Sequence, residues 1–335
     1  MSNGSRKDYK LCVAPMMAWT DRHCRRLHRL LAPKTRLYTE MLTTGALLHS
    51  DPDRLLRYSA EEKPLALQLG GSNPQHLAQC SELAQAHGFD EVNLNVGCPS
   101  SRVQQAAIGA CLMKQPELVA SCVREMQNYV DIPVTVKCRT GIDDEDSFEF
   151  LERFISCVAE TGVTVFIIHA RKAMLKGLSP AQNRHAPPLN FERVYKIKQK
   201  YPGLTIVING GIQNTQQTLT ALEHTDGVML GRAAYQNPLL LPVLEDAVFG
   251  IARTISPREA LEEYMPYVHQ ELSTGTRLQS ITRHLLNLFN GIPGAKSYRR
   301  HLSENARLTG AGIEVLYDAL KKVRDLDKQQ VKQLC

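Results

Sequence analysis

The sequence predicts an α/β protein in which a (β/α)8 TIM barrel is followed by a small all-helical bundle domain. First, eight short apolar, β-branched segments recur between Leu11 and Leu230, and segments with helical apolar spacing separate them. Second, this alternation stops after Leu241, and only helical patterns follow. Third, several of the eight segments end in polar residues, as strands do at the active-site end of a barrel. A doubly wound open sheet is the alternative interpretation of the same alternation.

The elements of the barrel follow one another along the chain. Strands are expected at residues 11–15, 36–38, 65–69, 91–95, 133–137, 165–169, 205–209 and 227–230. Amphipathic helices are expected between them at residues 21–31, 75–86, 116–129, 147–160, 191–200 and 215–223. Pro74 and Pro116 predict two of the helix starts, because proline at the first helical position loses no hydrogen bond.

The remainder of the chain has helical periodicity only. Helices are expected at residues 257–271, 277–288, 295–305 and 312–326, with a turn at residues 290–294, where two glycines and a proline stand. We therefore expect a catalytic barrel over residues 1–245 and a helical domain over residues 246–335.

The composition is that of a folded, water-soluble protein. The 335 residues are 43% hydrophobic and carry a formal net charge of +6, a mild excess of cations that suits a polyanionic partner. Nine cysteines at irregular spacings, with no CxxC pair, indicate reduced thiols and no metal site. The first residues lack the apolar core of a signal peptide, and no apolar run is long enough to span a bilayer. We expect a cytoplasmic protein.

Two glycine-bearing strand ends predict a phosphate site. Asn209, Gly210 and Gly211 follow the seventh expected strand, and Gly231 and Arg232 follow the eighth. Barrels bind phosphate at this place, because bare backbone N–H groups approach the anion closely and a cation adds to them. A pair of tight turns is the structural alternative.

Lys137 ends the fifth expected strand, where an unpaired ammonium inside a barrel would be unfavourable. A flavin would supply the missing negative charge, because a lysine near its pyrimidine ring stabilises the reduced form. Other strand ends offer hydrogen bonds or an apolar surface to such a ring: Gln68, His169, Pro15, Met16 and Met17. Each of these residues taken singly could equally have a structural role.

Cys98 stands between Gly97 and Pro99, directly after the fourth expected strand. This place separates it from Cys80 and Cys122, which lie in helical patterns and are expected in the core. A cysteine thiol is mostly protonated at neutral pH and can serve as a general acid. A nearby ammonium would favour the thiolate, and the sequence leaves both states open.

A basic face on the helical domain suggests a polyanion partner. Lys296, Arg299 and Arg300 are spaced i, i+3 and i+4, so they project from one side of their helix. Phosphate-backbone binding requires such a concentration of cations, whereas an ordinary solvated helix surface is the structural alternative.

Taken together, these segments resemble the tRNA-dihydrouridine synthases. The resemblance rests on residues 93–99 (NLNVGCP), 136–141 (VKCRTG), 169–171 (HAR) and 209–211 (NGG). Residues 169–189 and 294–303 are similar to the A-type bacterial subfamily. The resemblance extends from about Leu11 to Ser303, nearly the whole chain.

The resemblance implies a flavin-binding barrel with FMN as cofactor and NADPH as reductant. It implies reduction of uridine to 5,6-dihydrouridine at positions 20 and 20a of the tRNA D loop, with hydride from N5 of FMN to C6 and a proton from Cys98 to C5. By motif position, FMN would be held by Pro15, Met16, Met17, Gln68, Lys137, His169, Asn209, Gly210, Gly211, Gly231 and Arg232. By the same positions, tRNA would be contacted by Asn95, Arg184, Arg299 and Arg300. We expect a monomer that binds no metal and no membrane.

Two rival functions share some of these features. A small-molecule flavin oxidoreductase of the dihydroorotate-dehydrogenase type would have the barrel, FMN and a strand-end cysteine, but not the basic helical tail. A flavin-associated tRNA-binding or chaperone protein would need the basic face but not Cys98. Dependence of the activity on Cys98 would separate these possibilities.

Overall fold

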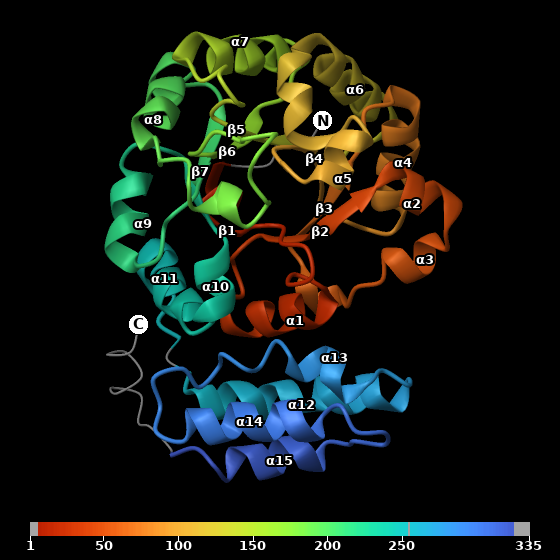
Figure 1. Ribbon diagram of the computed structural model, residues 1–335, viewed down its shortest axis with the longest axis vertical. Coiled ribbons are helices and arrows are strands. Elements are labelled where there is room, and N and C mark those ends of the chain that lie inside the picture. Colours follow the sequence, from red (N-terminus) through yellow and green to blue (C-terminus); the bar gives the residue numbers. More distant parts are fainter. Residues whose placement is uncertain (1–5, 254, 325–335) are drawn as a thin grey trace.

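The computed structural model describes residues 6–253 and 255–324, and Figure 1 shows a barrel with a layer of helices beneath it. The eight parallel strands form one sheet in the order β1-β8-β7-β6-β5-β4-β3-β2. The strands are β1 Leu11–Val13, β2 Leu37–Thr43, β3 Leu65–Gly70, β4 Glu91–Val96, β5 Val134–Arg139, β6 Val165–His169, β7 Thr205–Asn209 and β8 Gly227–Leu230.

The ring closes between β1 and β2. The Val13 amide donates to the Arg36 carbonyl at 2.9 Å, and the Arg36 amide donates to the Leu11 carbonyl at 3.0 Å. The prediction of a (β/α)8 barrel is therefore confirmed, and the open-sheet alternative is wrong.

β2 is longer than the sequence predicts. Its pairing with β3 continues to Thr43, with a shift in register between Tyr38 and Met41. The apolar run ends at Tyr38 because Thr39 and Glu40 are polar, although the backbone pairing continues past them. Side-chain periodicity alone could not show this extension.

Helices surround the barrel (Figure 1). The six expected helices are all present: α1 Arg22–Leu31, α4 Pro74–Ala86, α6 Pro116–Tyr129, α7 Phe148–Ala159, α8 Phe191–Lys200 and α9 Thr215–Leu222. The sequence did not predict the segments α2 Thr44–His49, α3 Pro52–Leu55, α5 Ser101–Gln105, α10 Arg232–Gln236, α11 Leu240–Phe249, η1 Arg6–Tyr9, η2 Ala60–Glu62, η3 Gly109–Lys114 and η4 Gln182–Arg184. Most of these segments are too short to show a helical period.

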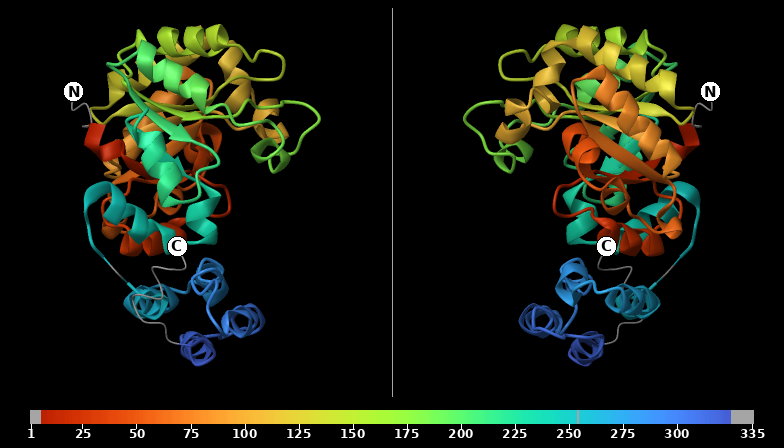
Figure 2. Two further views of the ribbon diagram at one scale, coloured as in Figure 1. Left: turned by 90° about the vertical axis from the view of Figure 1, so that its left-hand side faces the viewer. Right: turned by 90° about the vertical axis from the view of Figure 1, so that its right-hand side faces the viewer.

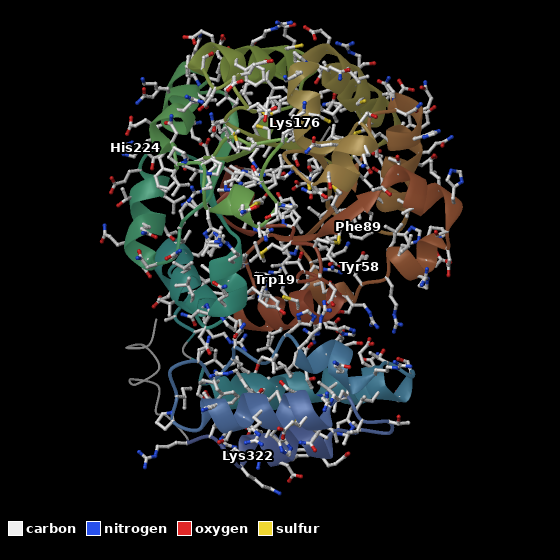
Figure 3. All side chains as sticks on the ribbon, viewed as in Figure 1. Trp19, Tyr58, Phe89, Lys176, His224 and Lys322 are labelled. Carbon is white, nitrogen blue, oxygen red and sulfur yellow. The ribbon has the colours of Figure 1, made fainter. Side chains whose placement is uncertain are left out.

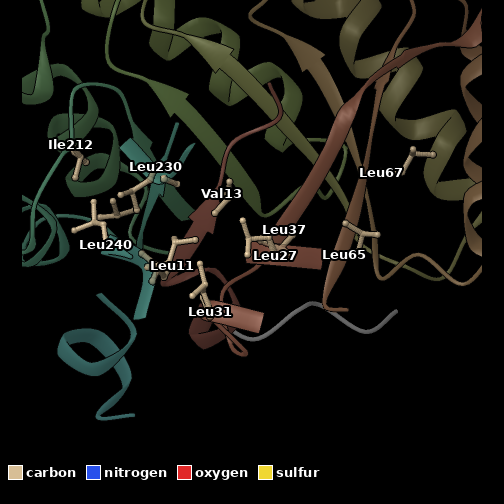
Figure 4. Packing of buried hydrophobic residues seen from close by; sticks show 14 of the residues in the cluster. Leu11, Val13, Leu27, Leu31, Leu37, Leu65, Leu67, Ile212, Leu230 and Leu240 are labelled. Carbon is tan, nitrogen blue, oxygen red and sulfur yellow. The ribbon is translucent and has the colours of Figure 1, made fainter. Parts of the chain in front are cut away.

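Two apolar cores hold the barrel together. The outer core lies between the strands and the helices, and Figure 4 shows Leu11 and Leu37 of the sheet packed near Leu27 and Leu31 of α1. The inner core fills the barrel with Tyr9, Cys12, Ala14, Tyr38, Ala66, Val165, Ile167, Val207 and Met229. Among the described residues, none of β4 or β5 belongs to this inner core, so the barrel interior has a polar side.

The C-terminal helices form a bundle beneath the barrel in Figure 1. They are α12 Pro257–Ser273, α13 Leu278–Thr282, α14 Ala295–Asn305 and α15 Glu314–Leu320. α12 contacts α1, because the Tyr264 hydroxyl donates to the His23 carbonyl at 2.8 Å and the Tyr267 hydroxyl lies 2.7 Å from Nδ1 of His23. α11 runs without a break through residue 245, and the domain division at that residue stays a prediction.

The prediction of one helix over residues 277–288 is wrong beyond Thr282. There the backbone bonds tighten to i→i+3, as between the Leu285 amide and the Thr282 carbonyl at 2.9 Å. The cause is tertiary, since Arg283 and His284 both contact the Asp21 carboxylate of the barrel, at 3.1 and 2.9 Å. The last expected helix is shorter than predicted, and residues 325 and 326 lie outside the described residues.

Candidate active site

A cavity of about 480 Å³ opens at the C-terminal ends of the strands. α5 and η4 project on this side of the barrel, as Figure 2 shows. Fourteen residues that the sequence singled out line it together: Pro15, Met16, Met17, Gln68, Asn95, Cys98, Lys137, His169, Arg184, Asn209, Gly210, Gly211, Gly231 and Arg232. The barrel thus gathers into one site residues that are more than two hundred positions apart in the sequence.

Hydrogen bonds hold the backbone of the loop that carries Cys98. Oδ1 of Asn95 accepts from the amides of Gly97 at 3.1 Å and Cys98 at 2.9 Å. Nε of Arg139 donates to the Gly97 carbonyl at 3.1 Å, and the Ala110 amide donates to the Cys98 carbonyl at 2.9 Å. The half-buried thiol of Cys98 therefore stands on a fixed backbone at the edge of the cavity.

Lys137 is a cation without a matching anion. Its Nζ donates to Oδ1 of Asn209 at 3.1 Å, and Nδ2 of Asn209 donates to the Met229 carbonyl at 2.7 Å, which turns the amide oxygen toward the lysine. Burial, together with the charge of Arg139, lowers the pKa of Lys137 to about 7. No carboxylate among the described residues forms an ion pair with it. A negatively charged ligand would restore the ammonium form.

His169 lies against the glycine turn after β7. Burial and the nearby charges of Arg139 and Lys137 keep the pKa of His169 well below its usual range, so the imidazole is neutral. Gly210 has φ +115°, and a Cβ there would lie 2.6 Å from Cδ2 of the His169 ring. Gly211 has φ +72°, and a Cβ there would collide with Leu189. Both positions require glycine, and the bare backbone faces the cavity.

Gly231 is less constrained than Gly210 and Gly211. Its φ is −108°, and a Cβ there would lie 3.9 Å from the Met16 sulfur, which is ordinary contact. The structure places Gly231 in the cavity wall, but steric crowding does not explain the glycine.

Arginines gather at the mouth of the cavity. Arg232 hydrogen-bonds the His185 ring and donates to the Arg184 carbonyl at 3.2 Å. Arg171, which the sequence did not single out as a site residue, donates to the His185 carbonyl at 3.2 Å and to Pro187. Burial and the charge of Arg184 lower the pKa of Arg232.

The charged side chains that line the cavity are all cationic. Four cationic residues line the cavity, and no described aspartate or glutamate does: the cations are Lys137, Arg139, Arg184 and Arg232. Such a wall attracts anions and is unsuited to a positively charged ligand. The geometry therefore favours a ligand that carries phosphate or a delocalised negative charge.

Arg139 and Trp19 line the cavity, although the sequence did not single them out as site residues. Arg139 is 4% exposed, and its Nη1 donates to the Asn183 carbonyl at 3.2 Å; burial lowers its pKa to about 10. Its position two residues after Lys137 on one strand, and therefore on the same face, could have revealed it. Trp19, the only tryptophan of the chain, stacks on Tyr235 with ring centroids 4.4 Å apart. Figure 3 shows Trp19 at the side of the barrel toward the helical bundle.

Two predicted tRNA contacts lie away from the cavity. Arg299 donates from Nη1 to Oδ1 of Asn290 at 2.9 Å, and the exposed Arg300 pairs with Glu304 at 2.8 Å. Both arginines are on α14, in the bundle beneath the barrel. The structure does not bring them together with the cavity residues.

The eight cysteines within the described ranges are all free thiols. No cluster of three or more histidine, cysteine, aspartate or glutamate side chains that could hold a metal occurs in residues 6–253 and 255–324. In the same part of the chain, no helix has the length and apolar character needed to cross a bilayer.

Comparison with known proteins adds a family assignment. The family model described as "Dihydrouridine synthase (Dus)" matches residues 12–324. A protein of Vibrio cholerae serotype O1 named "tRNA-dihydrouridine(20/20a) synthase" is 56% identical over 316 residues, which cover 94% of this chain and 96% of the relative. Relatives with the same name from Escherichia coli strain K12 and Shewanella oneidensis are 56% and 55% identical; these alignments cover 94% and 95% of this chain, and 92% and 95% of the relatives.

Proposed function

The chain belongs to the dihydrouridine synthase family, and on that premise we propose that it reduces uridine to 5,6-dihydrouridine at positions 20 and 20a of the tRNA D loop. The proposed cofactor is FMN and the proposed reductant is NADPH. The observation that supports the proposal most directly is a cavity lined by four cations and no described carboxylate, with a free thiol at its edge.

The residues present fit FMN. Gly210 and Gly211 offer bare backbone where a Cβ would collide with neighbours, and Arg232 adds a cation beside them, as a phosphate requires. Lys137 can supply the positive charge that stabilises a reduced flavin ring, and its pKa is lowered in the free protein by burial and by the charge of Arg139. Gln68, His169, Asn209, Gly231 and the run Pro15, Met16 and Met17 complete the proposed flavin site. When bound, FMN supplies the hydride that adds to C6 of uracil.

Cys98 is the proposed proton donor to C5. Saturating the double bond needs one hydride and one proton, and a thiol held on a fixed backbone can deliver the proton. The Asn95 amide and the neutral imidazole of His169 are hydrogen-bonding groups of the same cavity, able to stabilise negative charge that develops on the carbonyl oxygens of the ring.

The target uridine must leave the folded tRNA to reach this cavity, as bases do in enzymes that modify them. We propose that Arg184 at the cavity mouth, Asn95 inside it, and Arg299 and Arg300 on α14 contact the tRNA. In this proposal residues 1–245 carry the chemistry and residues 246–335 contribute to tRNA binding. The proposed place of action is the cytoplasm, and the proposed form is a monomer.

Nucleoside mass spectrometry of tRNA incubated with the protein, FMN and NADPH tests this function. Wild-type protein should form dihydrouridine, and in Cys98→Ala the rate of its formation should fall by roughly 100-fold or more, because a general acid is lost. Cys98→Ala should still bind FMN and oxidise NADPH. Cys157→Ala is the matched control, because this half-buried thiol of α7 lies outside the cavity lining.

Two results would count against the proposal. Absence of dihydrouridine with the wild-type protein would exclude the function. Equal yields from Cys98→Ala and Cys157→Ala would exclude Cys98 as the proton donor.

A further inference from the structure

The inward face of β4 is entirely polar, which is unusual for a barrel interior. Val92, Leu94 and Val96 belong to the outer core, so the alternating residues Glu91, Asn93 and Asn95 face the inside. Barrel interiors are normally filled by branched apolar side chains. Because a buried polar group is unfavourable unless it is hydrogen-bonded, the partners of these three residues are informative.

These residues form part of a continuous series of hydrogen bonds that begins at Glu91, at the start of β4. The Thr135 hydroxyl donates to Oε1 of Glu91 at 2.5 Å. Nδ2 of Asn93 donates to Oγ1 of Thr135 at 2.8 Å, and Nε2 of Gln68 donates to Oδ1 of Asn93 at 2.8 Å. Glu91, Asn93 and Thr135 are fully buried, and Gln68 is 1% exposed.

The upper links reach the loop that carries Cys98. Nδ2 of Asn95 donates to Oε1 of Gln68 at 2.8 Å. Oδ1 of Asn95 accepts from the amides of Gly97 and Cys98. The interior chain, as we call Glu91, Thr135, Asn93, Gln68 and Asn95, therefore joins the buried carboxylate to the backbone of the proposed proton donor.

Both ends of the interior chain fix its direction. Glu91 pairs with the Arg36 guanidinium at 3.1 Å and accepts from the Tyr38 hydroxyl at 3.0 Å, and an ionised carboxylate can only accept. At the other end, the amide of Cys98 can only donate. Reversing any carboxamide between these ends would place two donors or two acceptors against each other. Each amide of the interior chain thus has one allowed orientation.

We propose that Glu91 and Thr135 are positioning residues that orient the amides of Gln68 and Asn95 from the barrel interior. Each of these two amides uses one N–H in the interior chain and keeps a second, and both side chains line the cavity. The fixed direction makes this wall a donor surface for carbonyl oxygens of a planar heterocycle. The identity of that heterocycle, flavin or uracil, rests on the proposed function, whereas the amide orientation does not.

Thr135→Val tests the proposal with little change in shape. The substitution removes the hydroxyl that both donates to Glu91 and accepts from Asn93, so the Glu91 end no longer fixes the direction of the interior chain. Thr135→Ser retains the hydroxyl and should behave as wild type within about twofold. Thr218→Val is the matched control: Thr218 is also fully buried, and its hydroxyl donates to the Asn214 carbonyl at 2.9 Å in α9.

The first measurement uses the flavin-free protein and is independent of the function. Hydrogen exchange of the side-chain amide protons of Gln68 and Asn95, followed by nuclear magnetic resonance, should be about tenfold faster in Thr135→Val than in wild type. Asn93 loses the acceptor that holds its carboxamide toward Gln68, and one hydrogen bond is worth about a factor of ten. Thr135→Ser and Thr218→Val should not accelerate it. Equal exchange in Thr135→Val and Thr218→Val would overturn the proposal.

The second measurement identifies the ring that the donors face. Weaker FMN binding by about tenfold, with a shifted visible spectrum, would assign them to the flavin. Unchanged FMN affinity with an about tenfold slower single-turnover reaction on tRNA would assign them to uracil. A purely structural role predicts that Thr135→Val and Thr218→Val lose equal stability to urea, while FMN affinity and the single-turnover rate stay unchanged. This outcome would also overturn the proposal. Failure of wild-type protein to bind FMN would contradict the proposed cofactor, while the exchange measurement would still decide on the interior chain.

Discussion

The unpaired charge of Lys137 predicts that FMN binding weakens as the pH rises above 7. Its pKa is lowered to about 7, first by burial and second by the charge of Arg139. The protonated fraction in the free protein therefore falls from about one half at pH 7 to about one hundredth at pH 9. A bound anion favours the ammonium and raises its pKa again, so binding takes up a proton in this range.

The expected magnitude follows from these fractions. Affinity for FMN should fall about 50-fold between pH 7 and pH 9, with a limiting slope of tenfold per pH unit. Three groups contribute little there: the pKa of His169 is held well below this range by burial, burial raises the pKa of Cys138 to about 12, and the second pKa of the phosphate is near 6. The part of the slope that Lys137→Met abolishes is assigned to Lys137.

Flavin fluorescence quenching, measured in titrations between pH 6 and pH 9, provides the assay. Lys137→Met should bind FMN weakly at every pH and show no slope above pH 7, because the titrating group is gone. Lys137→Arg keeps a permanent charge and should also be flat, which makes it the control for charge without titration. Calorimetry in two buffers of different ionisation enthalpy should show uptake of nearly one proton at pH 8 for wild type only. A flat wild-type profile, or a slope that survives in Lys137→Met, would refute the reasoning.

Two further predictions concern the glycine turn and the helical domain. Gly210→Ala and Gly177→Ala both force alanine into a positive φ, which should lower the free energy of unfolding in urea by about 1–3 kcal/mol. Only Gly210→Ala also places a methyl group against the His169 ring, so only this variant should lose FMN affinity. Equal flavin binding by the two variants would contradict the proposed phosphate site. Changing Lys296, Arg299 and Arg300 together to alanine should weaken tRNA binding and reduce the slope of log affinity against log salt by about one for each phosphate that is no longer bound, with flavin content unchanged. Unaltered tRNA binding across a salt titration would leave this face of α14 as an ordinary solvated surface.

The sequence determined the barrel and most of the residues that line its cavity. Short apolar runs that alternate with helical patterns located all eight strands, because strands buried on both faces form continuous apolar runs. Polar residues at the ends of those runs then had to share one end of the barrel, so Lys137, His169 and Asn209 could be placed together before any contact was known. Arg139 was missed, although its spacing from Lys137 already placed it on the same face.

Only the tertiary structure decided how these groups are held and charged. The early end of α13 follows from contacts between His284 and Asp21, which are more than 260 positions apart, and no local pattern encodes such a contact. The interior chain likewise joins side chains of the neighbouring strands β3, β4 and β5, although the sequence shows Asn93 only as a polar residue in a strand. Periodicity reports which face a residue occupies, because it depends only on the geometry of the local backbone. The lowered pKa of Lys137 and the single orientation of each amide depend on which distant groups surround them, and this is settled only when the strands close into a ring.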